Sequence, residues 1–588
     1  MLRRERVLLM RFTADLPRNV FLTGKGGVGK TSVACALATL LADRGKRTLL
    51  SSTDPASNVG QVFGVEIGHR VVSIPSVPGL DAIEIDPQEA ADRYRERTLA
   101  PVRDFLKPED LAAATEQLSG SCTTEVASFN EFTELLAEPT RTAAYDHVIF
   151  DTAPTGHTIR LLELPGEWTG FLDEGLGDAS CLGPMSGLDK ARGTYAAAVE
   201  ALASPERTRI ILVARADPSS IEEAERALLE LATVGVSATH LVVNGLLPDE
   251  ETHDPLADAI RAREAHAVAQ LPLALQRLTL DTLPLRATNM VGADALRRMF
   301  GPVDPPVAVA APTARGATSG LAALVDELAL GDKGLVMCMG KGGVGKTTVA
   351  AALAVALAER GKDVLLTTTD PAAHLDRTLG GDAAGIEVTS IDPDRATQDY
   401  RDRVMATKGR NLDGAGRAAL EEDLKSPCTE EIAVFQAFSK AIAQADKRFV
   451  VMDTAPTGHT LLLMDATGSY HREVARGLGS AKFTTPLMRL QDPGYTRVVI
   501  VTTPETTPVM EAQALVDDLA RADIAPWAWV VNQSLSLTGT SSPLLIQRAA
   551  NEAGPVAQVA RSASRLAQLA MQEVPPVGVE LAGLSLTR

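Results

Sequence analysis

The chain has 588 residues, which predicts several domains because a single domain usually holds about 100–200 residues. Its formal net charge of −18 argues against broad nucleic-acid binding, which needs clustered Lys and Arg. No apolar run approaches the roughly 20 residues that a membrane-spanning helix needs, and the five cysteines form no C-x-x-C pair. We therefore expect a soluble cytoplasmic protein with no membrane span of its own and no nucleic-acid partner.

Short apolar strands alternate with helix-length segments along the chain. Residues 19–23 predict a strand that is followed by a glycine-rich loop and by a helix over residues 32–43. Further strands are expected at residues 48–52, 147–150, 210–214 and 240–243, and again at residues 335–339, 364–368, 449–452, 498–501 and 530–531. Apolar strands separated by helices indicate an α/β fold, a mostly parallel sheet with helices on both faces.

The same sequence landmarks occur twice in the same order. GKGGVGK at residues 24–30 recurs at residues 340–346, and DTAPTGHT at residues 151–158 recurs at residues 453–460. Matching TDPA, Cys-Thr and Val-Asn segments accompany them, with offsets that shrink from 316 to 288 residues. The sequence therefore predicts a tandem duplication, with one half at residues 1–300, a linker at residues 301–333 and a second half at residues 334–588.

Each half carries a glycine-rich loop of the phosphate-binding type. Residues 24–31 and 340–347 both fit G-x-x-x-x-G-K-[ST], whose backbone N–H groups surround phosphate oxygens while its lysine reaches the β- and γ-phosphates and its hydroxyl binds Mg²⁺. The alternative, a glycine turn that binds nothing, would have to occur twice. We therefore predict two P-loop NTPase domains that bind ATP and Mg²⁺. Their loop residues are Gly24, Lys25, Gly26, Gly27, Val28, Gly29, Lys30, Thr31 and Ser32, and Gly340, Lys341, Gly342, Gly343, Val344, Gly345, Lys346, Thr347 and Thr348.

An additional lysine, Lys25 or Lys341, follows the first glycine of each loop. This resembles the deviant Walker A loop of one group of P-loop ATPases, in which that lysine crosses a dimer interface to the partner's nucleotide. A cation that arrives from the opposite face would stabilise charge during phosphoryl transfer. Simple solvent exposure is the alternative for a loop lysine, and it would have to be accidental in both halves.

Two pairs of aspartates follow predicted strands. Asp54 and Asp370 lie in the matching TDPA segments, where a carboxylate can orient or deprotonate the attacking water. Asp151 and Asp453 end apolar strands, which is the Walker B arrangement for holding Mg²⁺ directly or through water. A helix cap or a turn is the alternative for any one of them.

Asn244 and Asn532 come just after late strands at matching positions. Their carboxamides could hydrogen-bond the edge of an adenine. Asparagine after a strand is also common turn chemistry, so a turn remains the alternative.

The cysteines are the features that a generic ATPase does not need. Cys122 and Cys428 occupy matching places in the two halves, and Cys181 lies in a loop-like segment without a counterpart. Thiolates select soft ions, and three cysteines from two halves could supply the few thiolate ligands that a trivalent metalloid prefers. Cys35 and Cys338 lie in a predicted helix and strand, where a buried core cysteine is the expected interpretation.

With these motifs the sequence resembles the ArsA family, the arsenical pump-driving ATPases, along nearly its whole length. The resemblance is carried by both GKGGVGK loops, both DTAPTGHT segments, SCTTE at residues 121–125, CLGPM at residues 181–185 and SPCTEE at residues 426–431. It implies an ATPase that As(III) or Sb(III) activates, whose halves dock as an intramolecular pseudo-twofold dimer with both nucleotide sites at their interface.

The resemblance also implies the ligands and the partners. The metalloid ligands would be Cys122, Cys181 and Cys428, with His157, Ser426 and His459 as further ligands. The family works with a membrane arsenite carrier, which would place the chain peripherally at the inner face of the membrane, and it receives metalloid from a small arsenic metallochaperone.

Two other classes share the deviant loop. A targeting ATPase for tail-anchored membrane proteins would resemble a single-domain homodimer with a zinc-binding C-x-x-C and a Met-rich groove. This chain is tandem and has no C-x-x-C. A partitioning ATPase would need a basic patch or a basic amphipathic tail, whereas the tail from Glu573 onward is nearly uncharged.

Overall fold

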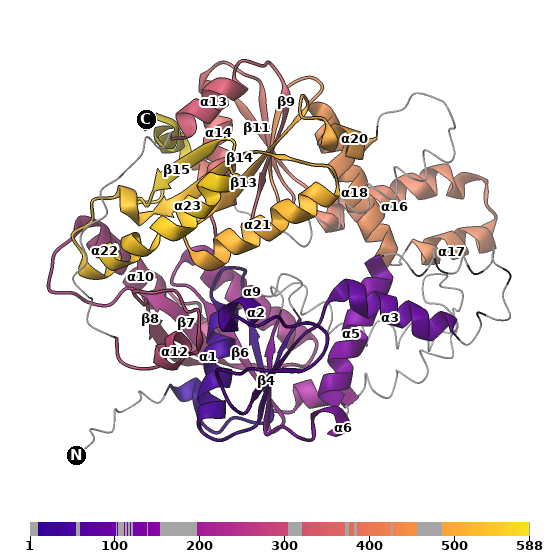
Figure 1. The fold of residues 1–588 in the computed structure, drawn as a ribbon. Coiled ribbons are helices and arrows are strands. Elements are labelled where there is room, and N and C mark those ends of the chain that lie inside the picture. Colours follow the sequence, from indigo (N-terminus) through magenta and orange to yellow (C-terminus); the bar gives the residue numbers. More distant parts are fainter. Residues whose placement is uncertain are drawn as a thin grey trace. The chain divides into compact units, whose positions relative to one another are not determined.

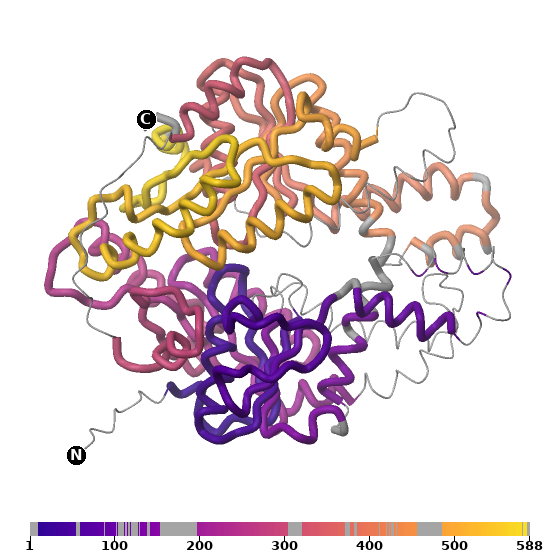
Figure 2. The backbone as a smooth tube through the Cα atoms, viewed as in Figure 1, coloured from indigo at the N-terminus to yellow at the C-terminus, as the bar shows by residue number. Residues whose placement is uncertain are grey.

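The computed structural model describes residues 10–53, 59–100, 121–137, 139–152, 197–303, 320–370, 375–381, 385–424, 427–455 and 485–586, together with single positions between residues 100 and 121. The chain divides into two compact units (Figures 1 and 2). Unit 1 comprises Met1–His253 and Ala257–Pro306, and unit 2 comprises Asp254–Leu256 and Val307–Arg588.

Unit 1 contains an eight-stranded sheet in the order β3-β4-β2-β5-β1-β6-β7-β8. The pairings are parallel except for the antiparallel pair of β3 and β4. The strands are β1 (Asn19–Thr23), β2 (Thr48–Ser52), β3 (Val72–Ser73), β4 (Leu80–Glu84), β5 (His147–Asp151), β6 (Thr208–Ala214), β7 (Ala238–Leu246) and β8 (Thr279–Pro284).

Unit 2 contains a seven-stranded sheet in the order β11-β10-β12-β9-β13-β14-β15, with parallel pairings throughout. The strands are β9 (Gly334–Met339), β10 (Val364–Thr368), β11 (Ile386–Ser390), β12 (Phe449–Asp453), β13 (Thr496–Thr502), β14 (Pro526–Ser534) and β15 (Leu566–Ala570). The predicted α/β class, with two mostly parallel sheets in tandem, is therefore confirmed.

Helices cover both faces of each sheet (Figure 1). In chain order before β9 they are α1 (Lys30–Asp43), α2 (Val59–Phe63), α3 (Pro87–Leu99), α5 (Ser121–Ala137), α6 (Pro139–Thr142), α9 (Pro218–Thr233), α10 (Pro255–Ala269), α11 (Leu273–Gln276), α12 (Ala293–Arg298) and α13 (Leu321–Leu328). After β9 they are α14 (Lys346–Glu359), α15 (Leu375–Leu379), α16 (Pro393–Thr407), α17 (Gly414–Asp423), α18 (Pro427–Gln444), α20 (Pro486–Gln491), α21 (Thr506–Arg521), α22 (Pro543–Asn551), α23 (Ala553–Ser562) and α24 (Gly583–Leu586). Short 3₁₀ turns occupy Arg11–Thr13, Gly409–Asn411, Leu535–Leu537 and Gly578–Ala582.

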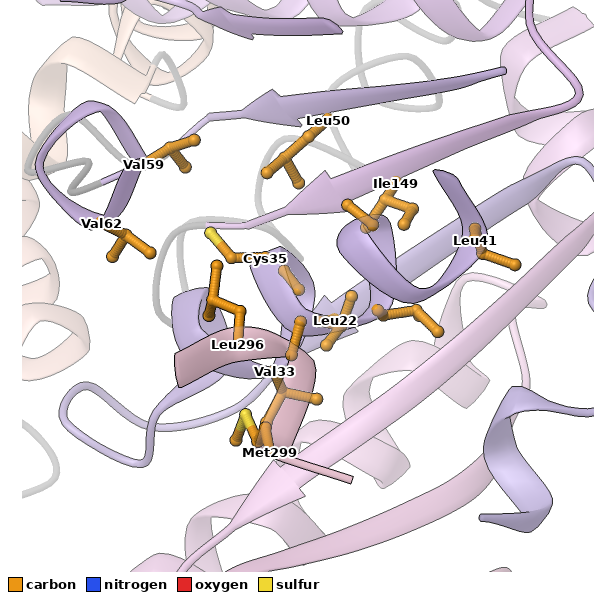
Figure 3. Packing of buried hydrophobic residues seen from close by; sticks show 14 of the residues in the cluster. Leu22, Val33, Cys35, Leu41, Leu50, Val59, Val62, Ile149, Leu296 and Met299 are labelled. Carbon is orange, nitrogen blue, oxygen red and sulfur yellow. The ribbon is translucent and has the colours of Figure 1, made fainter. Parts of the chain in front are cut away.

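Side chains of successive strand residues enter different cores, because they point to opposite faces of a sheet. Leu22 of β1 joins Val33 and Cys35 of α1 in one core, whereas Phe21 joins the core under α5 and α9. Figure 3 shows Cys35 surrounded by apolar side chains of the first core. Cys35 and Cys338 are both fully buried, as their positions predict, and burial raises the pKa of both thiols.

Several details differ from the sequence-based expectation. Helix α1 begins at Lys30, two residues early, because Gly29 before it adopts a left-handed conformation with φ of 90° that ends the loop. Strands β5 and β12 include Asp151 and Asp453 as their last residues. Residues 321–328, inside the predicted linker, form α13, whose apolar residues recur at helical spacing and join the unit 2 core.

Within the described residues, no helix is long and apolar enough to cross a membrane.

Candidate active site

Both glycine-rich loops adopt nearly the same backbone conformation. Gly24, Gly27 and Gly29 have φ of 152°, 83° and 90°, and the matching glycines of the second loop have φ of 153°, 83° and 90°. A Cβ on Gly24 would lie 2.1 Å from the carbonyl oxygen of Val213, so the loop lies directly against β6. The predicted glycines are therefore required both for positive φ and for close packing of backbone on backbone.

The P-loop lysines fold back over their own loops. Lys30 Nζ donates to the carbonyl oxygens of Gly24 at 2.9 Å and Lys25 at 3.1 Å, and Lys346 Nζ donates to the carbonyl oxygen of Lys341 at 3.0 Å. Both lysines are buried. Each ammonium group is thus held against its own loop, and in a loop of this type it reaches the β- and γ-phosphates of a bound nucleotide.

A threonine at the start of the following helix bonds to an aspartate at the end of a neighbouring strand. Thr31 Oγ1 donates to Asp151 Oδ2 at 2.7 Å, and Thr347 Oγ1 donates to Asp453 Oδ2 at 2.7 Å. Both aspartates are fully buried at the carboxyl ends of β5 and β12. Burial is the largest cause that raises the pKa of Asp453 to about 6, against opposing effects of Lys346 and Thr347.

These oxygen atoms fit a magnesium ion. Mg²⁺ prefers hydroxyl and carboxylate oxygens, and few of its ligands come from protein. Asp453 Oδ1 is buried without a hydrogen-bond partner among the described residues, and a buried carboxylate oxygen of this kind is stabilised by a cation. Thr347 and Asp453 would hold the ion in unit 2, and Thr31 and Asp151 in unit 1, where it would neutralise charge on the nucleotide phosphates.

Asn244 and Asn532 lie directly on the P-loops. Asn244 Nδ2 donates to the carbonyl oxygen of Val28 at 2.8 Å, and Asn532 Nδ2 donates to that of Val344 at 3.0 Å. A Cβ on Gly29 would lie 2.4 Å from Asn244 Nδ2. The amide nitrogen therefore fixes the loop, and the carboxamide is placed beside the phosphate site.

The additional lysines have different partners in the two units. Lys25 Nζ donates to Ser219 Oγ at 3.1 Å, and Ser219 Oγ in turn donates to Asp217 Oδ1 at 2.8 Å at the start of α9. Lys341 Nζ instead forms an ion pair with Glu511 of α21. Each contact lies within one unit, beside the loop that carries the lysine.

The switch segments are described in part. Asp370 lies just after β10, where its backbone N–H donates to Thr368 Oγ1 at 3.0 Å. Thr369 Oγ1 accepts from the backbone N–H of Ala455 at 2.9 Å, which joins the segment of Asp370 to the segment after Asp453. The counterpart of Asp370, Asp54, lies outside the described residues.

The candidate metalloid ligands lie mostly outside the described part of the chain. Cys122 is the second residue of α5 and Cys428 is the second residue of α18, so the backbone places them at matching helix starts. The predicted ligands His157, Cys181, Ser426 and His459 fall outside the described residues. Among the described side chains, no group of three or more His, Cys, Asp or Glu stands where it could hold a metal ion.

Sequence reasoning missed the residues that support the loops from behind. Thr152 Oγ1 donates to the carbonyl oxygen of Leu22 at 2.8 Å, and Thr454 Oγ1 donates to that of Cys338 at 2.9 Å, which joins each DTAP segment to the strand before the P-loop. Their repetition in both DTAPTGHT segments was visible in the sequence. The involvement of Ser219 and Glu511 had no comparable signal, because they lie 194 and 170 residues from their lysines.

Comparison with known proteins gives the family. A family profile described as anion-transporting ATPase matches residues 17–302 and 333–490. An arsenical pump-driving ATPase of Escherichia coli is 55% identical over 97% of this chain and 99% of its own length, and a putative arsenical pump-driving ATPase of Halobacterium salinarum is 37% identical over 85% and 83%. ATPase get3 of Schizosaccharomyces pombe is 28% identical over 47% of this chain and 88% of its own length. The chain is therefore an ATPase and belongs to the anion-transporting ATPase family, in which its relatives include arsenical pump-driving ATPases.

Proposed function

We propose that this ATPase hydrolyses ATP in response to trivalent arsenic or antimony and energises metalloid efflux through a membrane carrier. The observation that supports this proposal is the matching placement of Cys122 and Cys428 at the first turns of α5 and α18. The relatives that align over nearly the whole chain, and are named arsenical pump-driving ATPases, support the same function.

Helix α5, which carries Cys122, packs against the strands that lead to the phosphate site of unit 1. Phe132 of α5 packs edge-on against Phe21 of β1 and Phe150 of β5, with ring centroids 5.7 and 5.4 Å apart. Phe21 and Phe150 lie three residues before Gly24 and one residue before Asp151. A shift of α5 on binding a metalloid would therefore act on strands that carry both the P-loop and the Walker B aspartate.

In the proposed reaction each group has one task. Metalloid bound by the thiolates of Cys122, Cys181 and Cys428, assisted by His157, Ser426 and His459, draws the halves into a pseudo-twofold dimer. Lys25 and Lys341 then each meet the γ-phosphate bound by the other half, while Lys30 and Lys346 stabilise phosphate charge within their own loops.

The remaining groups position the water, the metal ion and the base. Asp54 and Asp370 position the attacking water, and Asp151 and Asp453 would hold Mg²⁺ directly or through water. The side-chain oxygens of Asn244 and Asn532 accept from the adenine edge, while their nitrogens keep bonding the loop. We place the protein in the cytoplasm, attached through the carrier to the inner face of the membrane and supplied by a small metallochaperone.

The decisive experiment measures the ATPase rate of the full chain against arsenite and antimonite concentration. We expect both ions to stimulate the wild type, and Cys181→Ser to raise the half-activating concentration about 10–100-fold, as loss of a metal-site group commonly does. Cys35→Ala is the matched control, because Cys35 is a buried core residue. Unchanged stimulation of Cys181→Ser would contradict the three-thiolate site. Stimulation by DNA or by an apolar tail-anchor peptide, but not by arsenite, would replace this function with one of the alternatives.

A further inference from the structure

Lys341 is paired with a carboxylate that is almost completely shielded from water. The side chain of Glu511 is 6% exposed and that of Lys341 is 18% exposed. Screening by solvent weakens the attraction between charges, so the Coulomb attraction within this shielded pair is stronger than between the same two groups on the surface. To reach a nucleotide phosphate, Lys341 has to leave this carboxylate.

Among the described residues Lys25 bonds a neutral hydroxyl, although unit 1 carries a glutamate at the equivalent place. The offset of 288 residues that relates β6 and α9 to β13 and α21 places Glu223 at the position of Glu511. Glu223 forms an ion pair with Arg226, three residues further along α9, at 4.0 Å. Lys25 instead donates to the hydroxyl of Ser219.

One of the sequence differences between α9 and α21 lies beside the two glutamates. The position of Arg226 is occupied by Ala514 in α21, at the same distance of three residues from the glutamate. Arg226 lies between Glu223 and Glu230 and bonds Glu230 at 2.7 Å, so it supplies positive charge along that face of α9. Ala514 supplies none, and Glu511 takes Lys341 as its cation.

We propose that Glu511 is a positioning residue that holds Lys341 inside its own half until a phosphate replaces the carboxylate, whereas Arg226 keeps Glu223 from holding Lys25 in the same way. The inference rests on the proposed function, in which each additional lysine serves the nucleotide of the other half. It predicts that the nucleotide served by Lys341, in the loop of residues 24–31, is hydrolysed more slowly than the nucleotide served by Lys25 while metalloid is absent.

The test follows the reactivity of each lysine and the metalloid-free ATPase rate in the full chain. Amine labelling without nucleotide, read by mass spectrometry, reports how firmly Lys341 and Lys25 are held. We expect Glu511→Gln and Ala514→Arg to speed labelling of Lys341 about three- to tenfold and to raise the metalloid-free rate by a similar factor. Ala514 is exposed, so Ala514→Arg is compatible with folding even if Glu511→Gln is not.

Unit 1 supplies the matched controls. Glu223→Gln should leave labelling of Lys25 unchanged, and Arg226→Ala should slow it, because the negative charge of Glu223 then lacks the neighbouring guanidinium and attracts Lys25 more strongly. Labelling of Lys341 that stays at the wild-type rate in both unit 2 variants would overturn the inference. Faster labelling with an unchanged metalloid-free rate would overturn the positioning role. Failure of the proposed function itself would look different, since arsenite would then not stimulate the wild type, whatever the labelling rates.

Discussion

Thr31 and Thr347 bond Asp151 and Asp453 over the same 2.7 Å, yet the lysines one residue into each loop have a hydroxyl partner in unit 1 and a carboxylate partner in unit 2. The groups that would touch phosphate or Mg²⁺ are fixed by the loop and the strand ends. The groups that contact Lys25 and Lys341 come from α9 and α21. The sequence of the P-loop does not constrain the surfaces of these two helices. A duplicated ATPase can therefore keep its reacting groups and differ in how it controls them.

The two units also differ in the core residues that pack behind the P-loops. Unit 1 packs Phe21 and Phe150 face to face, with ring centroids 4.3 Å apart, under Phe132. At the matching positions unit 2 has Met337 and Met452, which share a core with Phe438. A rigid aromatic cluster and an adaptable methionine cluster thus occupy the same place in the fold.

We expect the largest effect when one P-loop lysine is replaced at a time. Lys30→Met and Lys346→Met should each lower the hydrolysis rate at the altered site about 10²–10³-fold, because a buried charge that stabilises the transition state is lost. In a single-turnover assay the fast phase should fall from two ATP hydrolysed per chain to one in each variant. Lys46→Met, at an exposed position, is the control. If either variant still hydrolyses two ATP per chain in the fast phase, the altered loop is not a catalytic site.

The next effect concerns the stability of unit 2 and its pH dependence. The pKa of Asp453 is raised from 3.8 to about 6, so the folded state holds this proton more tightly than the unfolded state does. The ionised carboxylate therefore destabilises the fold at pH 7, and this penalty fades as the pH falls through about 6 towards 4. The difference between these two pKa values corresponds to about 3 kcal/mol at pH 7.

Asp453→Asn should consequently raise the melting temperature at pH 7, without nucleotide or Mg²⁺, while it abolishes hydrolysis in unit 2. Near pH 4 the gain should vanish. Calorimetry of the full chain at several pH values measures both limits, and Asp394→Asn, at an exposed site of α16, gives the baseline. A lower melting temperature of Asp453→Asn at pH 7 would contradict this prediction. It would mean that neighbouring groups offset the free-energy cost of burying the Asp453 carboxylate.

The smallest effect compares the two cores. Phe132→Leu and Phe438→Leu both remove a ring, but of these two rings only Phe132 lies against two others among the described residues. Aromatic pairs contribute about 0.5–1.5 kcal/mol each, and methionine side chains can refill part of a gap. We expect Phe132→Leu to lower the local opening free energy of β1 by about 1 kcal/mol more than Phe438→Leu lowers that of β9. Hydrogen exchange of the two strands measures this difference, and equal losses would remove the proposed distinction between the cores.

Much of the site could be predicted because its residues are local and repeated. The loop glycines, Lys30 and Thr31 are neighbours in sequence, and Asp151 ends an apolar strand that is easily recognised. The edge strands β3, β8, β11 and β15 and the second strand of the first sheet, β4, escape sequence-based prediction, because they carry mixed polar and apolar residues and lack a continuous apolar run. Helix α13 was assigned to the linker because the Pro- and Gly-rich segment before it obscured its apolar spacing.

By itself the sequence determined the duplication, the α/β class, the two phosphate loops and the family, since each depends on short motifs whose chemistry acts over a few residues. The structure alone decided which distant side chains meet those motifs. Asn244 reaches the carbonyl oxygen of Val28 across 216 residues, and Glu511 reaches Lys341 across 170. Such contacts depend on how helices and strands pack in three dimensions, and packing brings together residues that no local pattern relates. The sequence therefore contains the difference between Arg226 and Ala514, but only the folded structure shows that these residues lie beside the glutamates near Lys25 and Lys341.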